Sequence, residues 1–221
     1  MPRPTRAELE AARALTVPDV LPGPDDPPLS VLFCGINPGL VTALTGHHFG
    51  RPGNRFWPAL HLSGFTPRLL RPAEQDALRG LGLGITNMVA RATARADELT
   101  DDEVRAGGRR LRELVARTRP RWLAVVGITA YRVAFDAPRA AVGPQETPPG
   151  DTRVWLLPNP SGLNAHWQLP DLAAEFARLR AAAAGGDGPG AGADAVPAQG
   201  RVAARPGSVG TGPAADGDTA E

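Results

Sequence analysis

Short, almost wholly apolar runs alternate along the chain with segments whose apolar residues recur at helical spacing. Uninterrupted apolar runs are typical of parallel strands buried on both faces. The expected strands are Ser30–Ile36, Gly84–Met88, Trp122–Gly127 and Val154–Pro158. The expected helices are Arg6–Leu15, Asn54–Ser63, Pro72–Gly80, Asp101–Arg117, Thr129–Phe135 and Leu169–Ala184. This alternation predicts an α/β fold with three layers, α/β/α, around a short, mostly parallel central sheet.

The segment Asp101–Arg117 carries the clearest helix signals. Thr100 can cap its first turn, and three acidic residues follow at the end of the helix where the dipole favours negative charge. Gly107 and Gly108 in its middle are expected to weaken the helix locally, because glycine is a poor helix former.

Composition divides the chain into a body and two flanking segments. Residues 1–28 predict an N-terminal extension made of a short helix and a connector rich in Pro and Asp. The body, residues 29–184, contains all the expected strands. Residues 185–221 contain no aromatic residue, Leu or Ile, so they cannot bury enough apolar surface to offset chain entropy. We therefore expect this tail to be disordered.

The residue types present limit the kinds of site. Cys34 is the only cysteine and lies in an apolar run, so we expect it to be buried, and a disulfide within the chain or a cysteine-ligated metal site is excluded. All the basic residues are arginine, so no lysine can form a Schiff base. The N-terminal residues lack the apolar core of a signal peptide and no apolar run is long enough to span a bilayer, so we expect a cytoplasmic protein without membrane contact.

Two loops that contain Asn and Pro each follow an expected strand. They are Gly35–Gly39 (GINPG) and Asn159–Leu163 (NPSGL). If both strands are parallel, both loops emerge at the sheet edge where open α/β folds bind ligands. Asn-Pro and Pro-Gly pairs also occur in ordinary turns, so each loop alone favours a turn. Together the loops favour a cleft for a small, polar, planar molecule.

A stretch rich in His, Arg and aromatic residues, residues 45–58, lies between these loops. We expect Phe56 and Trp57 to belong to the core, at the start of a helix. Phe49 lies in the loop beside His48 and is a candidate for stacking on a ring. A metal site at the His-His pair is the weaker alternative, because no acidic residue is near in sequence.

Four motifs, in this order and spacing, resemble the mismatch-specific uracil-DNA glycosylases, the family of bacterial Mug and the thymine-DNA glycosylases. The motifs are GINPG (35–39), TGHHFGRPGNRFW (45–57), GITNMVARAT (84–93) and LPNPSGLN (157–164). The resemblance covers roughly residues 29–180. It implies the uracil-DNA glycosylase fold, with a central sheet of four or five strands, and no cofactor or metal is expected.

The resemblance also implies roles for individual residues. Asn37 matches the asparagine that positions the hydrolytic water, and Ile36 and Phe49 match residues that line the extruded base and stack on it. Asn87 matches a base-contacting position. The residues that match the loop entering the duplex are Asn159, Ser161, Gly162 and Leu163, with Leu163 as the wedge and Gly162 beside the widowed guanine. Asn159, at the start of this loop, is also expected to bind the substrate.

Two positions depart from the family pattern. Ala165 stands where a Mug relative has an arginine that reaches the opposite strand. Either His166 or Arg51 substitutes for it, or the specificity for guanine is relaxed. Thr42 stands where some relatives have a smaller side chain beside the base. These departures leave the substrate range open.

The resemblance predicts a monomeric, monofunctional DNA glycosylase that flips and hydrolytically removes uracil, with thymine and ethenocytosine as further candidates. Its partner is double-stranded DNA with a G·U or G·T mispair, and its reaction starts base excision repair. An amide orients water but does not take its proton, so we expect slow turnover. The alternatives are a single-strand-preferring uracil glycosylase, a nearly inactive mismatch-binding module, and an unrelated α/β protein with chance turn motifs.

Overall fold

In the computed structural model, which describes residues 4–146 and 151–185, a five-stranded sheet has the order β2-β1-β3-β5-β4. The strands are β1 (Val31–Gly35), β2 (Leu83–Asn87), β3 (Trp122–Val126), β4 (Gly143–Gln145) and β5 (Arg153–Leu157). The first four in this spatial order are parallel, and β4 pairs antiparallel with β5. The predicted mostly parallel sheet is confirmed.

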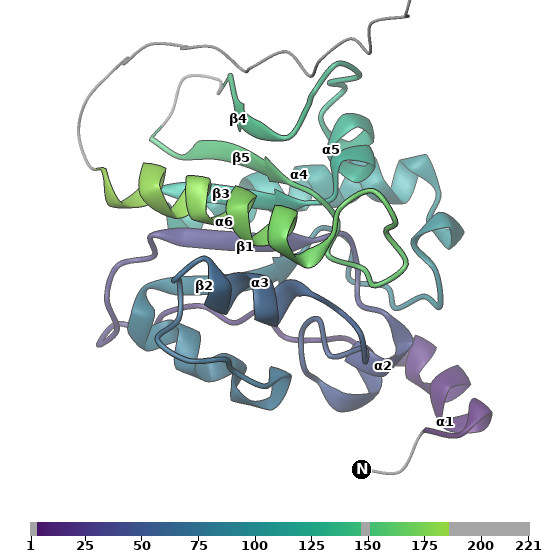
Figure 1. The fold of residues 1–221 in the computed structure, drawn as a ribbon. Helices are drawn as coiled ribbons and strands as arrows, with labels where there is room; N and C mark the ends of the chain where they lie inside the picture. The colour runs from purple at the N-terminus through teal and green to yellow at the C-terminus, as the bar shows by residue number, and fades with distance from the viewer. Residues whose placement is uncertain (1–3, 147–150, 186–221) are drawn as a thin grey trace, which may run out of the picture. The chain divides into compact units, whose positions relative to one another are not determined.

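Helices cover both faces of this sheet (Figure 1). The α-helices are α1 (Arg6–Ala11), α2 (Leu40–Thr45), α3 (Phe56–Leu62), α4 (Asp101–Thr118), α5 (Ile128–Ala134) and α6 (Leu169–Ala184). The 3-10 segments are η1 (Ala12–Ala14), η2 (Pro72–Leu81) and η3 (Ala96–Glu98). Helices α3 and α6 pack together on one face, and α4 and α5 pack together on the other. The fold therefore has the three predicted layers.

Successive side chains of β1 enter opposite layers of the core. Phe33 packs with Phe56 of α3 and Phe176 of α6, and the Phe33–Phe56 ring centroids are 5.5 Å apart. Leu32 and Cys34 join the cluster that contains α4 and α5. Cys34 is buried, as predicted, and burial raises the pKa of its thiol. Since both faces of the strand are covered, its sequence is a continuous apolar run.

Besides the three-residue segment η3, one helix and one strand were not expected from the sequence. Helix α2 follows the Pro38-Gly39 turn and ends at Gly46, which adopts a left-handed conformation with φ of 71°. Strand β4 has the sequence Gly-Pro-Gln, without an apolar pattern, and forms at the sheet edge, where a proline is tolerated. Helix α3 begins at Phe56 rather than at Asn54, because the Asn54 Oδ1 accepts a hydrogen bond from the Phe56 N–H at 2.9 Å.

The two glycines inside α4 are points of close packing, a role that their poor helix propensity did not predict. The helix runs unbroken through them. A Cβ at Gly107 would lie 2.5 Å from the Met88 carbonyl oxygen, and a Cβ at Gly108 would lie 2.8 Å from that of Ala134. The glycines therefore allow α4 to approach the end of β2 and helix α5. Thr100 caps α4 as expected, since its side chain accepts from the Glu103 N–H.

Part of the N-terminal extension packs against β2. Val20 and Ile85 exchange two backbone hydrogen bonds of 2.8 Å, and Val20 is buried. The Thr86 hydroxyl donates to Asp19 Oδ1 at 2.7 Å. The tail for which we predicted disorder, residues 185–221, lies outside the described residues except for Gly185, which follows the end of α6. Among the helices described, none combines the length and apolarity needed to cross a membrane.

Candidate active site

The four parallel strands end side by side, and their carboxyl ends form one edge of the sheet. Gly35 at the end of β1 is in register with Asn87 at the end of β2, and Val126 of β3 is in register with Leu157 of β5. The loops that follow β1, β2 and β5 therefore emerge from the same edge (Figure 1), as the sequence predicted for the loops after β1 and β5. In open α/β sheets this edge binds ligands.

The side-chain amide of Asn37 is held by the loop that follows β2. Its Nδ2 donates to the Thr93 hydroxyl at 2.7 Å and to the Arg91 carbonyl oxygen at 2.9 Å. A carbonyl oxygen only accepts, so the atom that faces Arg91 must be the nitrogen. The Thr93 N–H also donates to the Pro38 carbonyl oxygen at 3.1 Å. Both amide hydrogens are thus directed into the protein, and Asn37 Oδ1 is left as an acceptor.

A buried histidine determines the orientation of the Asn87 amide. His48 Nε2 lies 2.9 Å from the Pro18 carbonyl oxygen and therefore carries the hydrogen. His48 Nδ1 then accepts from Asn87 Nδ2 at 3.3 Å. Burial lowers the pKa of His48 below its usual value of 6.5, while Asp19 and the bond to Pro18 act in the opposite direction. Because Nδ1 of the neutral ring accepts, the amide nitrogen of Asn87 must face His48, and Asn87 Oδ1 faces away from it.

Asn87 and Phe49 meet at Gly35. A Cβ on Gly35 would lie 2.7 Å from Asn87 Oδ1 and 3.4 Å from Phe49 Cζ. Phe49 is half-buried, has a positive φ of 52°, and stacks on Phe56 with ring centroids 3.9 Å apart. Phe56 and Trp57 are core residues, as predicted. A glycine at the end of β1 therefore leaves the room that the amide and the ring occupy.

Ile36 lies on the opposite side of the β1 end from these residues. It packs against the cluster that contains α4 and α5. A Cβ on Gly127, at the end of β3, would lie 2.8 Å from Ile36 Cγ1. The structure thus places Ile36 at the same sheet edge, over β3.

We call residues 159–167, which follow β5, the wedge loop. Leu163 near its tip is 76% exposed. Asn159 Oδ1 accepts from the Ser161 N–H at 3.0 Å, and the Ser161 hydroxyl accepts from the Leu163 N–H at 3.3 Å. A Cβ on Gly162 would lie 2.6 Å from the Gly53 carbonyl oxygen. The side-chain oxygen of Asn159 is thus used inside the loop, which presents an apolar side chain to solvent.

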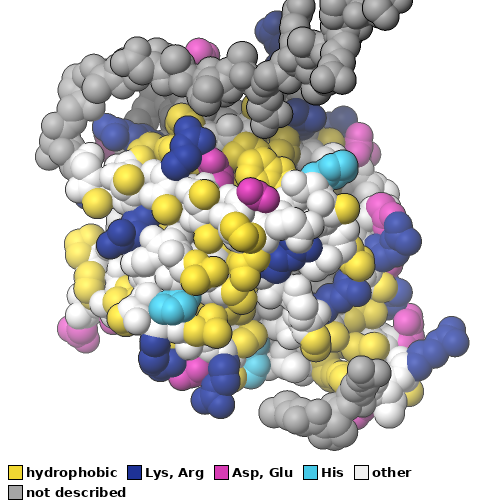
Figure 2. Space-filling view, in the orientation of Figure 1, with side chains coloured by type: hydrophobic (Ala, Val, Ile, Leu, Met, Phe, Trp, Pro, Cys, Tyr) yellow, Lys and Arg dark blue, Asp and Glu magenta, His cyan; other side chains and the backbone are white. Residues whose placement is uncertain are grey.

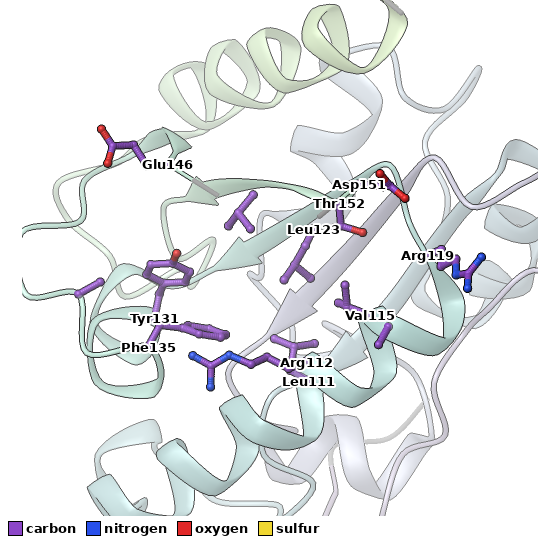
Figure 3. A pocket seen from close by; sticks show the side chains of 13 residues that line it. Leu111, Arg112, Val115, Arg119, Leu123, Tyr131, Phe135, Glu146, Asp151 and Thr152 are labelled. Carbon is purple, nitrogen blue, oxygen red and sulfur yellow. The ribbon is translucent and has the colours of Figure 1, made fainter. Parts of the chain in front are cut away.

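Two cavities differ in their relation to this edge. One of about 540 Å³ lies between α4, α5 and β5, where Arg112 lies over the Phe135 ring at 4.7 Å (Figure 3). None of the predicted site residues lines it. The other, of about 240 Å³, lies at the wedge loop. Its lining residues are Arg51, Pro52, Gly53, Asn54, Ser161, Gly162 and Leu163.

Charge alone does not mark the site. Arginine and acidic side chains are scattered among hydrophobic ones over the face seen in Figure 2. Among residues 4–146 and 151–185, no cluster of three or more His, Cys, Asp or Glu side chains could hold a metal ion. Both ring nitrogens of His48 contact protein partners instead.

Sequence reasoning did not identify the contacts made by His48 and Arg55. The sequence pattern indicates His48 only as a candidate metal ligand. Arg55 donates to carbonyl oxygens of the wedge loop, and its position directly before the buried Phe56-Trp57 pair was the only available signal.

Residues 22–183 match the protein-family model described as Uracil DNA glycosylase superfamily. The matched span contains all five strands of the sheet and every predicted site residue.

Proposed function

We propose, from the premise that this chain belongs to the uracil DNA glycosylase superfamily, that it removes uracil from G·U mispairs in double-stranded DNA. The observation that carries this proposal is the amide of Asn37. This amide lies just after the end of β1. Its nitrogen donates hydrogen bonds to the loop after β2, and its oxygen is left to accept a hydrogen bond. The exposed Leu163 emerges from the same sheet edge.

The first step is extrusion of the base. A paired base is out of reach of an enzyme pocket, and rotating it out costs a few kcal/mol, least for a mispair. Leu163 is an apolar wedge that fills the vacated stack and recovers part of that cost. Gly162 beside it allows the backbone to approach the widowed guanine.

The extruded base is then recognised by Phe49 and Asn87. Phe49, backed by Phe56, offers a ring on which a pyrimidine stacks. Asn87 Nδ2 is engaged with His48, so Asn87 Oδ1 accepts from the base. Uracil and thymine carry a donor at N3, whereas cytosine carries an acceptor there. This arrangement favours uracil over cytosine.

Hydrolysis follows at the sugar. Asn37 Oδ1 accepts a hydrogen bond from a water and directs its oxygen toward C1′. The bond from this oxygen to C1′ forms as the N-glycosidic bond breaks, and uracil leaves with the electron pair. The attacking water loses its proton to solvent, and the uracil anion takes one up. The products are free uracil and an abasic site. An amide does not act as a general base, so turnover is slow.

A Mug relative has an arginine that reaches the opposite strand at the position of Ala165. Arg51 is our candidate for making that contact in this chain. Arg51 is exposed and lines the small cavity together with Ser161 and Leu163. His166 does not line that cavity. A guanidinium at this place suits either a phosphate or the widowed guanine.

The test is a panel of labelled duplexes that carry uracil, thymine, ethenocytosine or hypoxanthine opposite guanine or adenine, together with the unpaired uracil strand. We expect an abasic product fastest from G·U. Equal or faster excision from the unpaired strand would favour the single-strand alternative. Tight binding to G·U without an abasic product would favour the mismatch-binding module.

A further inference from the structure

Arg55 connects helix α3 to the wedge loop through both its backbone and its side chain. Its backbone N–H donates to the Pro160 carbonyl oxygen at 2.9 Å. Its Nη2 donates to the carbonyl oxygens of Gly162 at 2.9 Å and Asn164 at 3.0 Å. Its Nη1 donates to the carbonyl oxygen of Trp167. Carbonyl groups from both halves of the wedge loop thus converge on a single residue.

The backbone of Arg55 is fixed to the core. The Arg55 carbonyl oxygen accepts from the Ala59 N–H at 2.9 Å in the first turn of α3. Phe56 and Trp57, which follow directly, are 0% and 3% exposed. Any movement of Arg55 would therefore require movement of the packed helix.

The side chain of Arg55 is directed to the loop by its chemistry. Among the ion pairs found in the described part of the chain, none involves Arg55, so its charge is balanced by carbonyl dipoles. A guanidinium presents several N–H donors in a rigid planar fork, which suits carbonyl groups that lie apart from one another.

The internal hydrogen bonds of the wedge loop shape its tip. Asn164 Nδ2 donates to the Asn159 carbonyl oxygen at 2.9 Å, and the Asn164 N–H donates to the Ser161 carbonyl oxygen, also at 2.9 Å. These bonds join residues of the same loop and do not fix the loop on the body of the protein. The contacts of Arg55 on either side of the exposed Leu163 do so.

We propose that Arg55 is a positioning residue that holds the wedge loop in the conformation that enters the duplex before DNA binds. The inference rests on the proposed function of Leu163 as the wedge. A loop ordered in advance does not pay its ordering entropy on binding, so more of the wedge contact is available to drive base extrusion.

The consequence is selective for paired substrates. Extrusion from a stacked duplex needs the wedge, whereas a uracil in an unpaired bubble is already accessible. Loss of the Arg55 contacts should therefore slow excision from a G·U duplex and spare excision from a bubble. A general defect in folding or in catalysis would slow both.

The variants are Arg55→Met, which removes the charge and the donors, and Arg55→Lys, which keeps the charge without the planar fork. Arg109→Met is the matched control, because Arg109 is an exposed arginine of α4. Single-turnover excision is measured on a G·U duplex and on the same uracil in a bubble. Amide hydrogen exchange of residues 161–167 is measured on the free proteins.

We expect both Arg55 variants to exchange faster in the wedge loop and to lose about tenfold in duplex rate, equivalent to about 1.4 kcal/mol, with bubble rates within about twofold of the wild type. Wild-type exchange and wild-type duplex rates in Arg55→Lys would overturn the inference, as would an equal loss on both substrates. If the wild type excised no uracil at all, the proposed function would fail, and the exchange measurement would still test the contact itself.

Discussion

The side-chain amide of Asn37 donates a hydrogen bond to the hydroxyl of Thr93 at 2.7 Å and thereby joins the loop after β1 to the loop after β2. The two loops are also joined through the Thr93 N–H and the Pro38 carbonyl oxygen. Thr93 is buried, so its hydroxyl offers a fixed acceptor. The orientation of the proposed water-binding oxygen therefore depends on a residue 56 positions away in the chain.

Replacing Thr93 with valine should slow uracil excision without changing DNA binding. The variant removes one acceptor of the Asn37 amide, although the bond to the Arg91 carbonyl oxygen remains. One hydrogen bond is worth about 1 kcal/mol, which corresponds to about fivefold in the single-turnover rate. Thr93→Ser keeps the hydroxyl and should retain a rate close to that of the wild type. Equal rates for the valine and serine variants would show that the hydroxyl does not orient Asn37.

Replacing Gly35 with alanine should reduce excision and lower stability by about 1 kcal/mol, the value of one hydrogen bond. The new Cβ would lie 2.7 Å from Asn87 Oδ1, and this buried amide can move away only by giving up its bond to His48. The amide would then be displaced from the place where we propose that it contacts the base. We expect at least a tenfold loss in rate, on the scale of a displaced catalytic group. Gly80→Ala is the control, since no atom lies within 4 Å of its added Cβ. Excision by Gly35→Ala at the wild-type rate would show that Asn87 does not contact the base.

The stability of the protein should fall as the pH drops below about 6.5, because the buried His48 has a lowered pKa. The unfolded chain binds the proton more readily than the folded one, so the free energy of unfolding is highest above 6.5 and decreases as the pH falls toward the folded-state pKa. Protonation of Nδ1 would also end its acceptance from Asn87.

Urea unfolding between about pH 5 and 7 measures this dependence, since carboxyl groups titrate mainly below that range. His48→Gln should flatten the curve, whereas His47→Gln should keep the wild-type slope. If His48→Gln kept the wild-type slope, His48 would be excluded as the source of the pH dependence of stability.

Excision should leave the DNA strand intact. A glycosylase that also cuts the strand attacks the sugar with an amine, and the chain contains no lysine. Reaction products of a G·U duplex should therefore run as full-length strands on a denaturing gel and break only after alkaline treatment. Strand breaks formed at neutral pH, without heat, would contradict the monofunctional assignment.

The four parallel strands were predictable because each is largely buried in the sheet and mostly apolar. Helix α2 was not, because its six residues follow a Pro-Gly turn and show no extended periodicity. Strand β4 has no pattern of its own and depends on pairing with β5. Local sequence carries no information about such tertiary pairing.

The candidate site was predictable in its motifs but not in its supporting contacts. The bond between His48 and Asn87 joins residues 39 positions apart and depends on a carbonyl group of the N-terminal extension. Arg55 likewise contacts backbone carbonyl oxygens, which every residue type provides. The type of the partner residue therefore does not reveal such a contact, and it cannot be predicted from the sequence.

The most direct test of the central claim compares Asn37→Ala with the wild type on a G·U duplex, by single-turnover excision and by equilibrium binding. We predict that the variant loses about a hundredfold or more in excision rate, because the water is no longer oriented, and that it binds the duplex as tightly as the wild type within about threefold. Excision by Asn37→Ala at the wild-type rate would contradict the account.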